Sequence, residues 1–589
     1  MSDNRTDSRL KAEIERPHAS GERRRFLALL LAVFLVALAV AASVFSRDPQ
    51  QRFSLPVASN QVVASDTAGA SSQAWYCPGP LPIGGWPHSV SSIYLADIGT
   101  DNLTATIMVS SSLTHYHSRI NVSLYQHSGV VVPLTRSGIK SFAAVSVIAN
   151  GPGIAATQVL DGPNGETASN CLTSPAESLG LAAGSTLDGK NINLSIYDPT
   201  STASIVNVAL SVVNIHDQSE SLAPPKLQGI TLEPGQVETF DIGKSIPEEV
   251  SAGLLLTALG GKVVAGAQLI NPGFANLGEG SLVTAAVPSA NRWSFPPIPA
   301  GLRDLNTYSI LNPNDRKLKL HFRLGENTKT AAENIVLSPD SETVLTPPLS
   351  SAPISFSQIK TVNVKGFAAA RQEAEKFLLG RQLPQMVPTE ITERSYLPLV
   401  IERSLVSVKA QQGPPVTLNA AAIGIIHNYY KASAIQIALE LGLKSASQAD
   451  LNAVSTLPGF GQGTATVNAF SAPMRKWLIL AGRSNKVNGQ LFTVSNPGNS
   501  SAKVRFFRIP MSYINKQSGP PTTGKYLPVI TIELKGHSTA TIDPDYLIGE
   551  PGPVAMEVVS RKKIFLEDIG YGRKAAGGIS LSTPLPIRP

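Results

Sequence analysis

Residues 183–213 read AGSTLDGKNINLSIYDPTSTASIVNVALSVV, and this stretch decides the fold class. Asp198 and Pro199 lie near its centre, between two runs rich in β-branched and other apolar residues. An aspartate side chain can accept a hydrogen bond from the backbone just after it, and proline fixes φ, so the pair is typical of a turn. We therefore expect the flanking runs to pair as antiparallel strands of a hairpin in a mainly β protein.

The same arrangement recurs along the chain. Gly184, the second residue of the quoted stretch, lies 15 residues before Pro199, and Gly482 lies 15 residues before Pro497. Asn312 precedes a third such proline, and Asp97 belongs to a fourth, more divergent copy. Most intervals between turns are near the ~100 residues of one sandwich domain. The repeats therefore predict tandem antiparallel β-sandwich (Ig-like) domains.

The repeats divide the chain into predicted segments. Four sandwich copies are expected at residues 75–178, 179–290, 291–410 and 476–589. The last interval between turns exceeds one sandwich length, which predicts an inserted connecting segment at 411–475. Within it, residues 430–444 carry apolar side chains at helical spacing, so a short helix is expected there.

Composition supports short strands and gives little reason to expect a nucleic-acid partner. Only 15% of the 589 residues are charged, and the chain contains 47 glycines and 44 prolines, which suits strands joined by tight turns. The net charge of +7 is a mild bias for this length, and part of it lies in the N-terminal tail. We therefore predict that the chain does not bind nucleic acid.

Residues 26–45 read FLALLLAVFLVALAVAASVF, an uncharged run long enough to cross a bilayer core of ~30 Å. Three arginines precede it directly, at 23–25, so the positive-inside rule leaves the N-terminus in the cytoplasm. The sequence thus predicts a single-pass signal-anchor protein of the cell membrane with an extracellular C-terminal region. The predicted segments are a cytoplasmic tail at 1–25, a transmembrane helix at 26–46 and a flexible linker at 47–74.

A cleaved signal peptide is the alternative interpretation of this N-terminal segment. Ala39-Val40-Ala41 resembles a cleavage site, although the apolar run is longer than the ~7–15 residues usual in signal peptides. Both interpretations place the remainder of the chain outside the cytoplasm.

The two cysteines, Cys77 and Cys171, both follow the membrane segment. An even number of cysteines in an exported chain predicts a disulfide, which would bracket the first sandwich copy. Two free buried thiols are the alternative. A zinc site is not expected from two cysteines so far apart.

Several short motifs together resemble a known family. They are Trp75-Tyr76-Cys77-Pro78-Gly79, the element Ala183-Gly184-Ser185 and the Asn/Asp-Pro turns. Over most of residues 75–589 the chain is similar to the actinobacterial membrane-anchored family with domain of unknown function 5719. The copies that begin with Trp293 and Trp477 keep the aromatic residue that often starts a repeat, whereas the second copy has Leu181 there. The resemblance implies an exported, β-rich envelope protein and carries over no catalytic residues.

Few residues qualify as site candidates. His115 and His117 are two apart, so on a strand both imidazoles would share one face and could bind one metal ion. Solvent-facing histidines are the alternative. Trp75, Tyr76 and Trp86 could stack against sugar rings, with core packing as the alternative. We predict no catalytic residue and no cofactor, and the common serine-hydrolase motif does not occur.

The sequence favours a non-enzymatic scaffold or binding module of the cell envelope. Repetition without a repeated polar cluster points to structure or recognition more than to chemistry. The predicted partners are the membrane, through residues 26–46, and cell-wall glycan or another envelope protein. The alternative is an envelope enzyme, or an accessory subunit of one, that acts on wall polysaccharide.

Overall fold

The computed structural model describes residues 64–65 and 72–588 with gaps, the widest at 346–358, 363–388 and 420–462. All of them belong to one compact unit, Ser59–Pro589. The predicted transmembrane helix at 26–46 and the predicted helix at 430–444 lie outside the described residues. Within the described ranges, no helix is both long and apolar enough to cross a bilayer.

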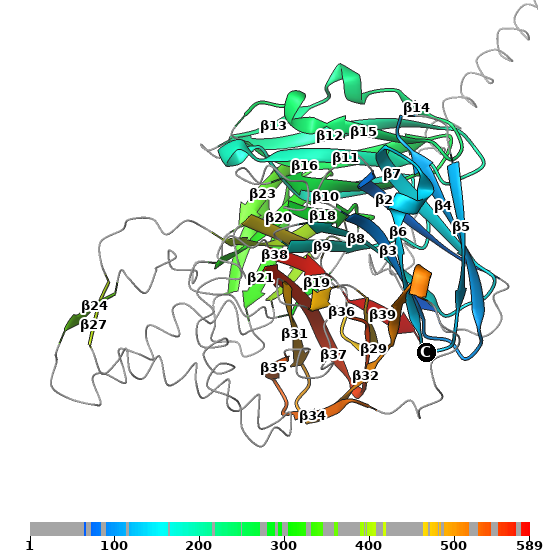
Figure 1. Cartoon of the computed structure of the whole chain (residues 1–589). Helices are drawn as coiled ribbons and strands as arrows, with labels where there is room; N and C mark the ends of the chain where they lie inside the picture. The colour runs from blue at the N-terminus through cyan, green and yellow to red at the C-terminus, as the bar shows by residue number, and fades with distance from the viewer. Residues whose placement is uncertain are drawn as a thin grey trace, which may run out of the picture. The chain divides into compact units, whose positions relative to one another are not determined.

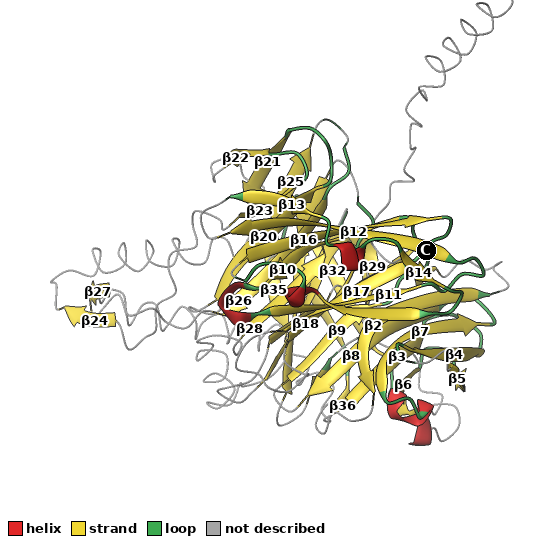
Figure 2. Ribbon diagram, turned by 90° about the horizontal axis from the view of Figure 1, so that it is seen from above, coloured by secondary structure: helices red, strands yellow, loops and turns green. Residues whose placement is uncertain are grey.

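The described part is mainly β, as predicted, and its strands form several mainly antiparallel sheets (Figure 1). Apolar side chains are buried in clusters between these sheets. Colouring by secondary structure shows how little of it is helical (Figure 2). The described helices are short 3-10 turns: η1 (Leu134–Ser137), η2 (Leu187–Gly189), η3 (Pro225–Leu227), η4 (Ile242–Lys244) and η6 (Ile514–Lys516).

The first β-sandwich contains eight strands in two sheets, with the orders β2-β7-β4-β5 and β6-β3-β8-β9. Its strands are β2 (Gln73–Ile83), β3 (Val90–Asp97), β4 (Leu103–Ser111), β5 (His117–Leu124), β6 (Gly129–Pro133), β7 (Ser141–Ala149), β8 (Ile154–Gly162) and β9 (Gly165–Asn170). Strand β4 alternates buried and more exposed residues, the pattern that one covered face imposes.

The second sandwich has the sheet orders β10-β16-β12-β13, with β14 also on β12, and β15-β11-β17-β18. Its strands are β10 (Ser178–Ser185), β11 (Asn191–Tyr197), β12 (Ser204–Asn214), β13 (Ser219–Leu222), β14 (Ile230–Leu232), β15 (Val237–Asp241), β16 (Val250–Leu259), β17 (Val264–Ile270) and β18 (Gly280–Thr284).

The third sandwich has the sheet orders β19-β25-β21-β22 and β23-β20-β26-β28. Its strands are β19 (Arg292–Phe295), β20 (Asp304–Asn312), β21 (Leu318–Leu324), β22 (Ala332–Leu337), β23 (Ser341–Leu345), β25 (Thr389–Glu393), β26 (Val400–Ser407) and β28 (Gly463–Asn468). A separate parallel pair joins β24 (Ile359–Val362) to β27 (Val416–Asn419).

The fourth sandwich differs because one 17-residue strand, β37, runs through both of its sheets. The orders are β29-β37-β32-β34 and β35-β31-β37-β38, with β39 on β29 and β1 on β39. The strands are β1 (Ala64–Ser65), β29 (Met474–Ile479), β30 (Arg483–Ser484), β31 (Asn488–Asn496), β32 (Ala502–Arg508), β33 (Met511–Tyr513), β34 (Ile530–Leu534), β35 (Ser538–Ile542), β36 (Gly552–Pro553), β37 (Met556–Gly572), β38 (Ile579–Ser582) and β39 (Leu585–Arg588).

All four sandwiches share one topology. If the strands of each are numbered one to eight along the chain, the two sheets have the orders 1-6-3-4 and 5-2-7-8. Strands β13 and β14 share the fourth position in the second sandwich, and the two halves of β37 supply the sixth and seventh positions in the fourth. The sequence repeats therefore correspond to a repeated strand topology.

The turn residues behave as predicted, but the hairpins do not. A side-chain oxygen of Asp97, Asp198, Asn312 and Asn496 accepts a hydrogen bond from the backbone amide two residues later, at 2.8, 2.8, 3.1 and 3.1 Å. The strands on either side of each turn do not pair with each other, so the predicted hairpin is wrong. Each turn is an arch over the core, and its side chain is buried where the chain crosses from one sheet to the other.

Three strands lie wholly where the sequence suggested connecting segments: β27 and β28 within 411–475, and β1 within 47–74. Strand β28 falls within residues 411–475 and pairs with β26, so it completes the third sandwich. Strand β1 falls within the predicted linker at 47–74 and pairs with β39 in parallel. Short strand pairing of this kind is not visible in local hydrophobic patterning, because the partners are far apart in the chain.

Each sandwich contacts the next, and the fourth also contacts the first. The hydroxyl of Ser195, in the second sandwich, donates to the carbonyl of Pro78 in the first at 2.6 Å. Strand β33 pairs in parallel with β6, and the backbone amide of Gly129 donates to the carbonyl of Pro510 at 2.8 Å. Leu480 and Leu585 from the end of the chain join the core of the first sandwich. The sandwiches therefore pack against one another and are not separate domains joined only by linkers.

Gly266 offers a test of this packing. A Cβ atom at this position of β17 would lie 2.5 Å from the carbonyl oxygen of Gly79 in the first sandwich. Cβ atoms in folded proteins essentially never come this close to another atom. We expect Gly266→Ala to lower the free energy of unfolding by about 1–3 kcal/mol in denaturant titrations. Gly552→Ala is the control, since its Cβ would meet no atom within 4 Å. Equal effects of the two substitutions would contradict the close packing.

Candidate functional site: buried polar contacts between sandwiches

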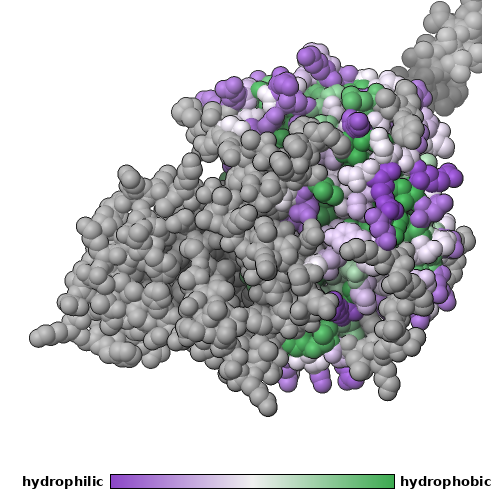
Figure 3. Space-filling view, in the orientation of Figure 1, coloured by the Kyte–Doolittle hydropathy of each residue, from purple (hydrophilic) through white to green (hydrophobic). Residues whose placement is uncertain are grey.

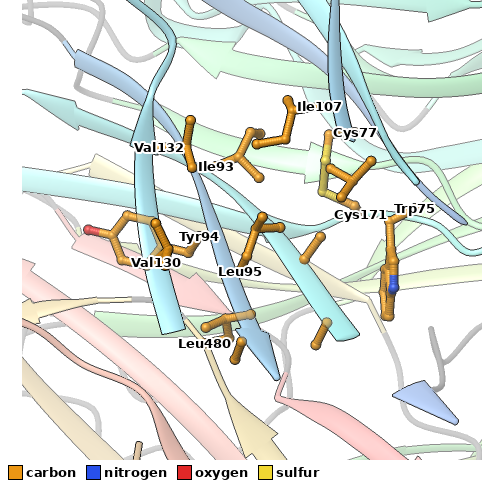
Figure 4. Close-up of a cluster of buried hydrophobic side chains, with 14 of the residues drawn as sticks. Trp75, Cys77, Ile93, Tyr94, Leu95, Ile107, Val130, Val132, Cys171 and Leu480 are labelled. Atoms are coloured by element: carbon orange, nitrogen blue, oxygen red, sulfur yellow. A yellow bond between two sulfur atoms is a disulfide. The ribbon is translucent and has the colours of Figure 1, made fainter. Parts of the chain in front are cut away.

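The predicted disulfide is present and lies in the core of the first sandwich (Figure 4). Cys77 on β2 is joined to Cys171, which directly follows β9, so the bond ties the first strand of this sandwich to its last. Both residues are fully buried. The alternative of two free thiols is therefore excluded.

The predicted stacking residues have different environments. Trp75 is fully buried, and its indole Nε1 donates to the carbonyl of Ile154 at 3.0 Å, so its ring serves in core packing (Figure 4). Tyr76 is partly buried and packs beside Tyr197 of the second sandwich. Trp86 lies outside the described residues. Trp75 therefore does not provide a surface on which a sugar ring could stack.

The predicted histidine pair is described only in part. His117 begins β5, is exposed, and its Nδ1 lies 3.0 Å from the Ser110 hydroxyl. His115 lies outside the described residues. Over the residues that the structure covers, no three His, Cys, Asp or Glu side chains gather closely enough to hold a metal ion.

Polar side chains connect the first sandwich to the second. The Thr284 hydroxyl on β18 lies 2.6 Å from the Ser169 hydroxyl on β9 and accepts from the Gln158 amide at 3.3 Å. Gln158 in turn accepts from the backbone amide of Gly79 at 3.0 Å. Because Gln158 and Thr284 are almost fully buried, these bonds fix how the two sandwiches meet.

A buried ion pair connects the third sandwich to the fourth. The guanidinium of Arg403, on β26, donates through Nη2 to Glu567 Oε2, on β37, at 2.7 Å, and both side chains are at most 2% exposed. Arg403 also donates to the carbonyl of Pro296 and lies over the Phe295 ring, 5.2 Å from its centroid. Burial raises the pKa of Glu567, and the Arg403 guanidinium opposes that rise.

Asp568, the next residue, is buried among polar groups of its own sandwich. Its carboxylate accepts from the Gln490 amide at 2.7 Å and from the Ser582 hydroxyl at 2.6 Å. Burial raises the pKa of Asp568 to about 7, although these two hydrogen bonds favour the ionised form. Glu567 and Asp568 project to opposite sides of the strand, so they serve different contacts.

A pair of buried carboxyls lies between the second and third sandwiches. Glu402 Oε2, on β26, accepts from the backbone amide of Ala183, on β10, at 2.7 Å. Glu342, on β23, is 2% exposed and lies near enough to Glu402 for the two charges to repel each other. Burial raises the pKa of Glu402 to about 7 and that of Glu342 well above its ordinary value.

None of these buried polar residues was predicted as a site residue from the sequence. Glu402-Arg403 and Glu567-Asp568 occupy corresponding positions of the seventh strand in their sandwiches, and both pairs interrupt an apolar strand. Two adjacent charges within a buried strand are uncommon, because a charge is expensive to bury without a partner. This interruption was the available signal. Chemically, Glu402, Arg403 and Glu567 are placed to hold neighbouring sandwiches together, whereas Asp568 bonds within its own sandwich.

Comparisons with known proteins add no identification. No family model and no curated protein matches the chain. Among solved structures, one likeness is to a putative secreted protein from Parabacteroides distasonis, at 10% identity and a TM-score of 0.12, over 33% of this chain and 77% of that one. Another is to the α-L-rhamnosidase of Streptomyces avermitilis complexed with L-rhamnose, at 10% identity and a TM-score of 0.13, over 86% of this chain and 43% of that one. Scores this low support no inference about fold or function.

Proposed function

We propose that this chain is a membrane-anchored, extracytoplasmic protein of the cell envelope that acts as a non-enzymatic scaffold or binding module. The anchor is the apolar segment at 26–46, and the described β-sandwiches form the exported part. The Cys77–Cys171 disulfide supports this location, because such bonds persist in oxidising compartments. The resemblance to the family with domain of unknown function 5719 agrees with it and stays a prediction.

The observation that supports the proposal is that buried polar side chains bond one sandwich to the next. Gln158, Glu402 and Arg403 each reach across a boundary and bond to a neighbouring sandwich. Residues used in this way hold modules in a fixed arrangement, which is what a scaffold or an extended recognition surface requires. On the face shown in Figure 3, the hydrophilic and hydrophobic residues of the described part are interspersed, as on a solvated surface.

Topology is the first test. We expect Thr202→Cys, at an exposed position of the second sandwich, to react with a membrane-impermeant maleimide on intact cells. Ser2→Cys, in the predicted cytoplasmic tail, should react only after lysis. Labelling is read on the full-length chain by gel shift, with the native chain as the blank, since its described cysteines form the disulfide. Reaction of Ser2→Cys alone on intact cells would refute the proposed orientation.

Ligand binding is the second part of the proposal. Wall glycan or another envelope protein is the proposed partner, and the detergent-solubilised full chain is the form to test. Co-sedimentation with purified wall glycan, compared with sedimentation after glycan digestion, supports a glycan partner if the chain is retained only by intact polymer. Release of soluble sugar during the incubation would argue for the enzyme alternative instead.

A further inference from the structure

Glu342 and Glu402 lie on the same face of the sheet β23-β20-β26. In the strand register, Glu342 is opposite Leu311 and Glu402 is opposite Ser309, so the two glutamates flank β20 on positions that point the same way. This face packs against β10 and β16 of the second sandwich, where Ala182 and Leu311 share an apolar cluster. The two carboxyls are therefore enclosed between two sandwiches, 2% and 1% exposed.

The carboxyls have few hydrogen-bond donors. Glu402 Oε2 has the backbone amide of Ala183, whereas Glu402 Oε1 and both oxygens of Glu342 have no bond of normal geometry within the described residues. The backbone amide of Gly253 lowers the pKa of Glu342, and the backbone amide of Ala182 lowers that of Glu402, but burial outweighs both. Two ionised carboxylates in this position would be mostly unsolvated and would repel each other.

No cation offsets them among the residues that the structure describes on the neighbouring strands. Strands β10, β12 and β16 carry no titratable side chain, and β13 contributes only the exposed Glu220. Asp340, in the turn before β23, is exposed, and its backbone carbonyl accepts a hydrogen bond from the Ser211 hydroxyl. Arg403, next to Glu402 in sequence, points to the other side of β26 and bonds to Glu567.

We propose that Glu342 and Glu402 form a proton-dependent latch between the second and third sandwiches, which are docked tightly while the carboxyls are protonated and open more readily once they ionise. A protonated carboxyl is neutral and can donate a hydrogen bond, so the enclosed pair is then compatible with burial. Ionisation adds two like charges to an interface that contains mainly alanine, glycine, leucine and valine.

The direction with pH follows from the pKa values in the docked and open states. The docked pKa of Glu402 is raised to about 7, whereas an exposed glutamate titrates near its ordinary value of 4.5. The contribution of the latch is therefore complete below about pH 4.5 and falls as pH rises to about 7, where the docked form also ionises. The raised pKa of Glu342 extends the loss to higher pH.

The latch can be tested on the full-length chain with a reporter thiol. Ala182→Cys places a cysteine within the latch interface, and Ala144→Cys places one in the apolar contact between the first and second sandwiches. Both alanines are fully buried, so each thiol reacts with a maleimide only on opening. The measured ratio is the labelling rate of Ala182→Cys divided by that of Ala144→Cys. This division cancels the intrinsic effect of pH on the thiol. We expect this ratio to rise at least ~10-fold between about pH 5 and about pH 8.

Isosteric substitution decides whether the two carboxyls cause the effect. In a Glu342→Gln, Glu402→Gln double variant the ratio should stay flat over the same pH range, because an amide keeps the shape of a protonated carboxyl. Glu220→Gln, at an exposed neighbour, should leave the rise intact. If Ala182→Cys does not fold, hydrogen exchange of the Ala183 amide, corrected for its intrinsic pH dependence, supplies the same comparison.

Two outcomes would overturn the latch. A pH-independent ratio in the native background is one, and an unchanged rise in the double glutamine variant is another. The topology and glycan experiments do not bear on this result, so the latch and the proposed function can fail independently.

Discussion

Replacing Arg403 with methionine is expected to lower the free energy of unfolding by about 3–5 kcal/mol, as the removal of one partner from a buried ion pair does. Glu567 would lose its only ion-pair partner among the described residues while its carboxyl stays fully buried. It must then remain a lone buried charge or bind a proton, and both are unfavourable. Denaturant titration monitored by tryptophan fluorescence and circular dichroism measures the loss.

Two further variants show whether burial causes the effect. Arg292, on β19, pairs with Glu390 at the same distance of 2.7 Å, but its side chain is 59% exposed. Arg292→Met should therefore change the free energy of unfolding by less than ~1 kcal/mol. Combining Arg403→Met with Glu567→Leu removes both charges and should recover much of the loss. Similar effects of Arg403→Met and Arg292→Met would contradict the assignment of the buried pair.

Local turn chemistry was predictable from sequence, whereas the direction of the chain after each turn was not. The oxygen of Asp198 and the amide of Thr200 are two residues apart, so their bond depends only on local conformation. Whether the next strand pairs with the previous one depends on partners much further along. Strand β12 pairs with β16, and β11 pairs with β17, so the turn after Asp198 joins two sheets. A local turn motif contains no information about those distant strand partners.

The buried polar contacts were hidden for a related reason. In the sequence, Glu402 and Arg403 look like ordinary surface charges, since such residues are mostly exposed in folded proteins. Their burial depends on Ala183, 219 residues away, and on Glu567, 164 residues away. Trp75 shows the opposite case, because its large apolar side chain made core packing a natural alternative that the structure then adopts. Composition predicts which residues can be buried, and long-range packing determines which of them are.

One position of the seventh strand carries a different residue, with a different kind of contact, in each of three sandwiches. By alignment on the turn residues, Glu402 and Glu567 correspond to Gly266 in the second sandwich. Gly266 permits a close backbone approach to Gly79, Glu402 accepts a backbone hydrogen bond, and Glu567 forms an ion pair. All three contact the preceding sandwich, so one position of the repeat lies at each of these three boundaries.

Loss of the disulfide is expected to lower the free energy of unfolding by about 4–5 kcal/mol, because the bond closes a loop of 94 residues in the unfolded chain. The Cys77→Ala, Cys171→Ala double variant and the reduced native chain should show similar losses in denaturant titrations. The change should extend beyond the first sandwich, since Leu480 and Leu585 of the fourth belong to the same core.

The reductant and the double variant check each other. Reductant should not change the unfolding of the double variant, which shows that its effect on the native chain acts through Cys77 and Cys171. Hydrogen exchange should rise first in β2 and β9, the strands that the bond ties together, and next in β39 through the shared core. An unfolding curve unchanged by complete reduction, verified by thiol titration, would mean that packing around Trp75 holds this sandwich without the covalent link. The disulfide would then remain evidence of an oxidising compartment, but it would no longer explain the stability of the first sandwich.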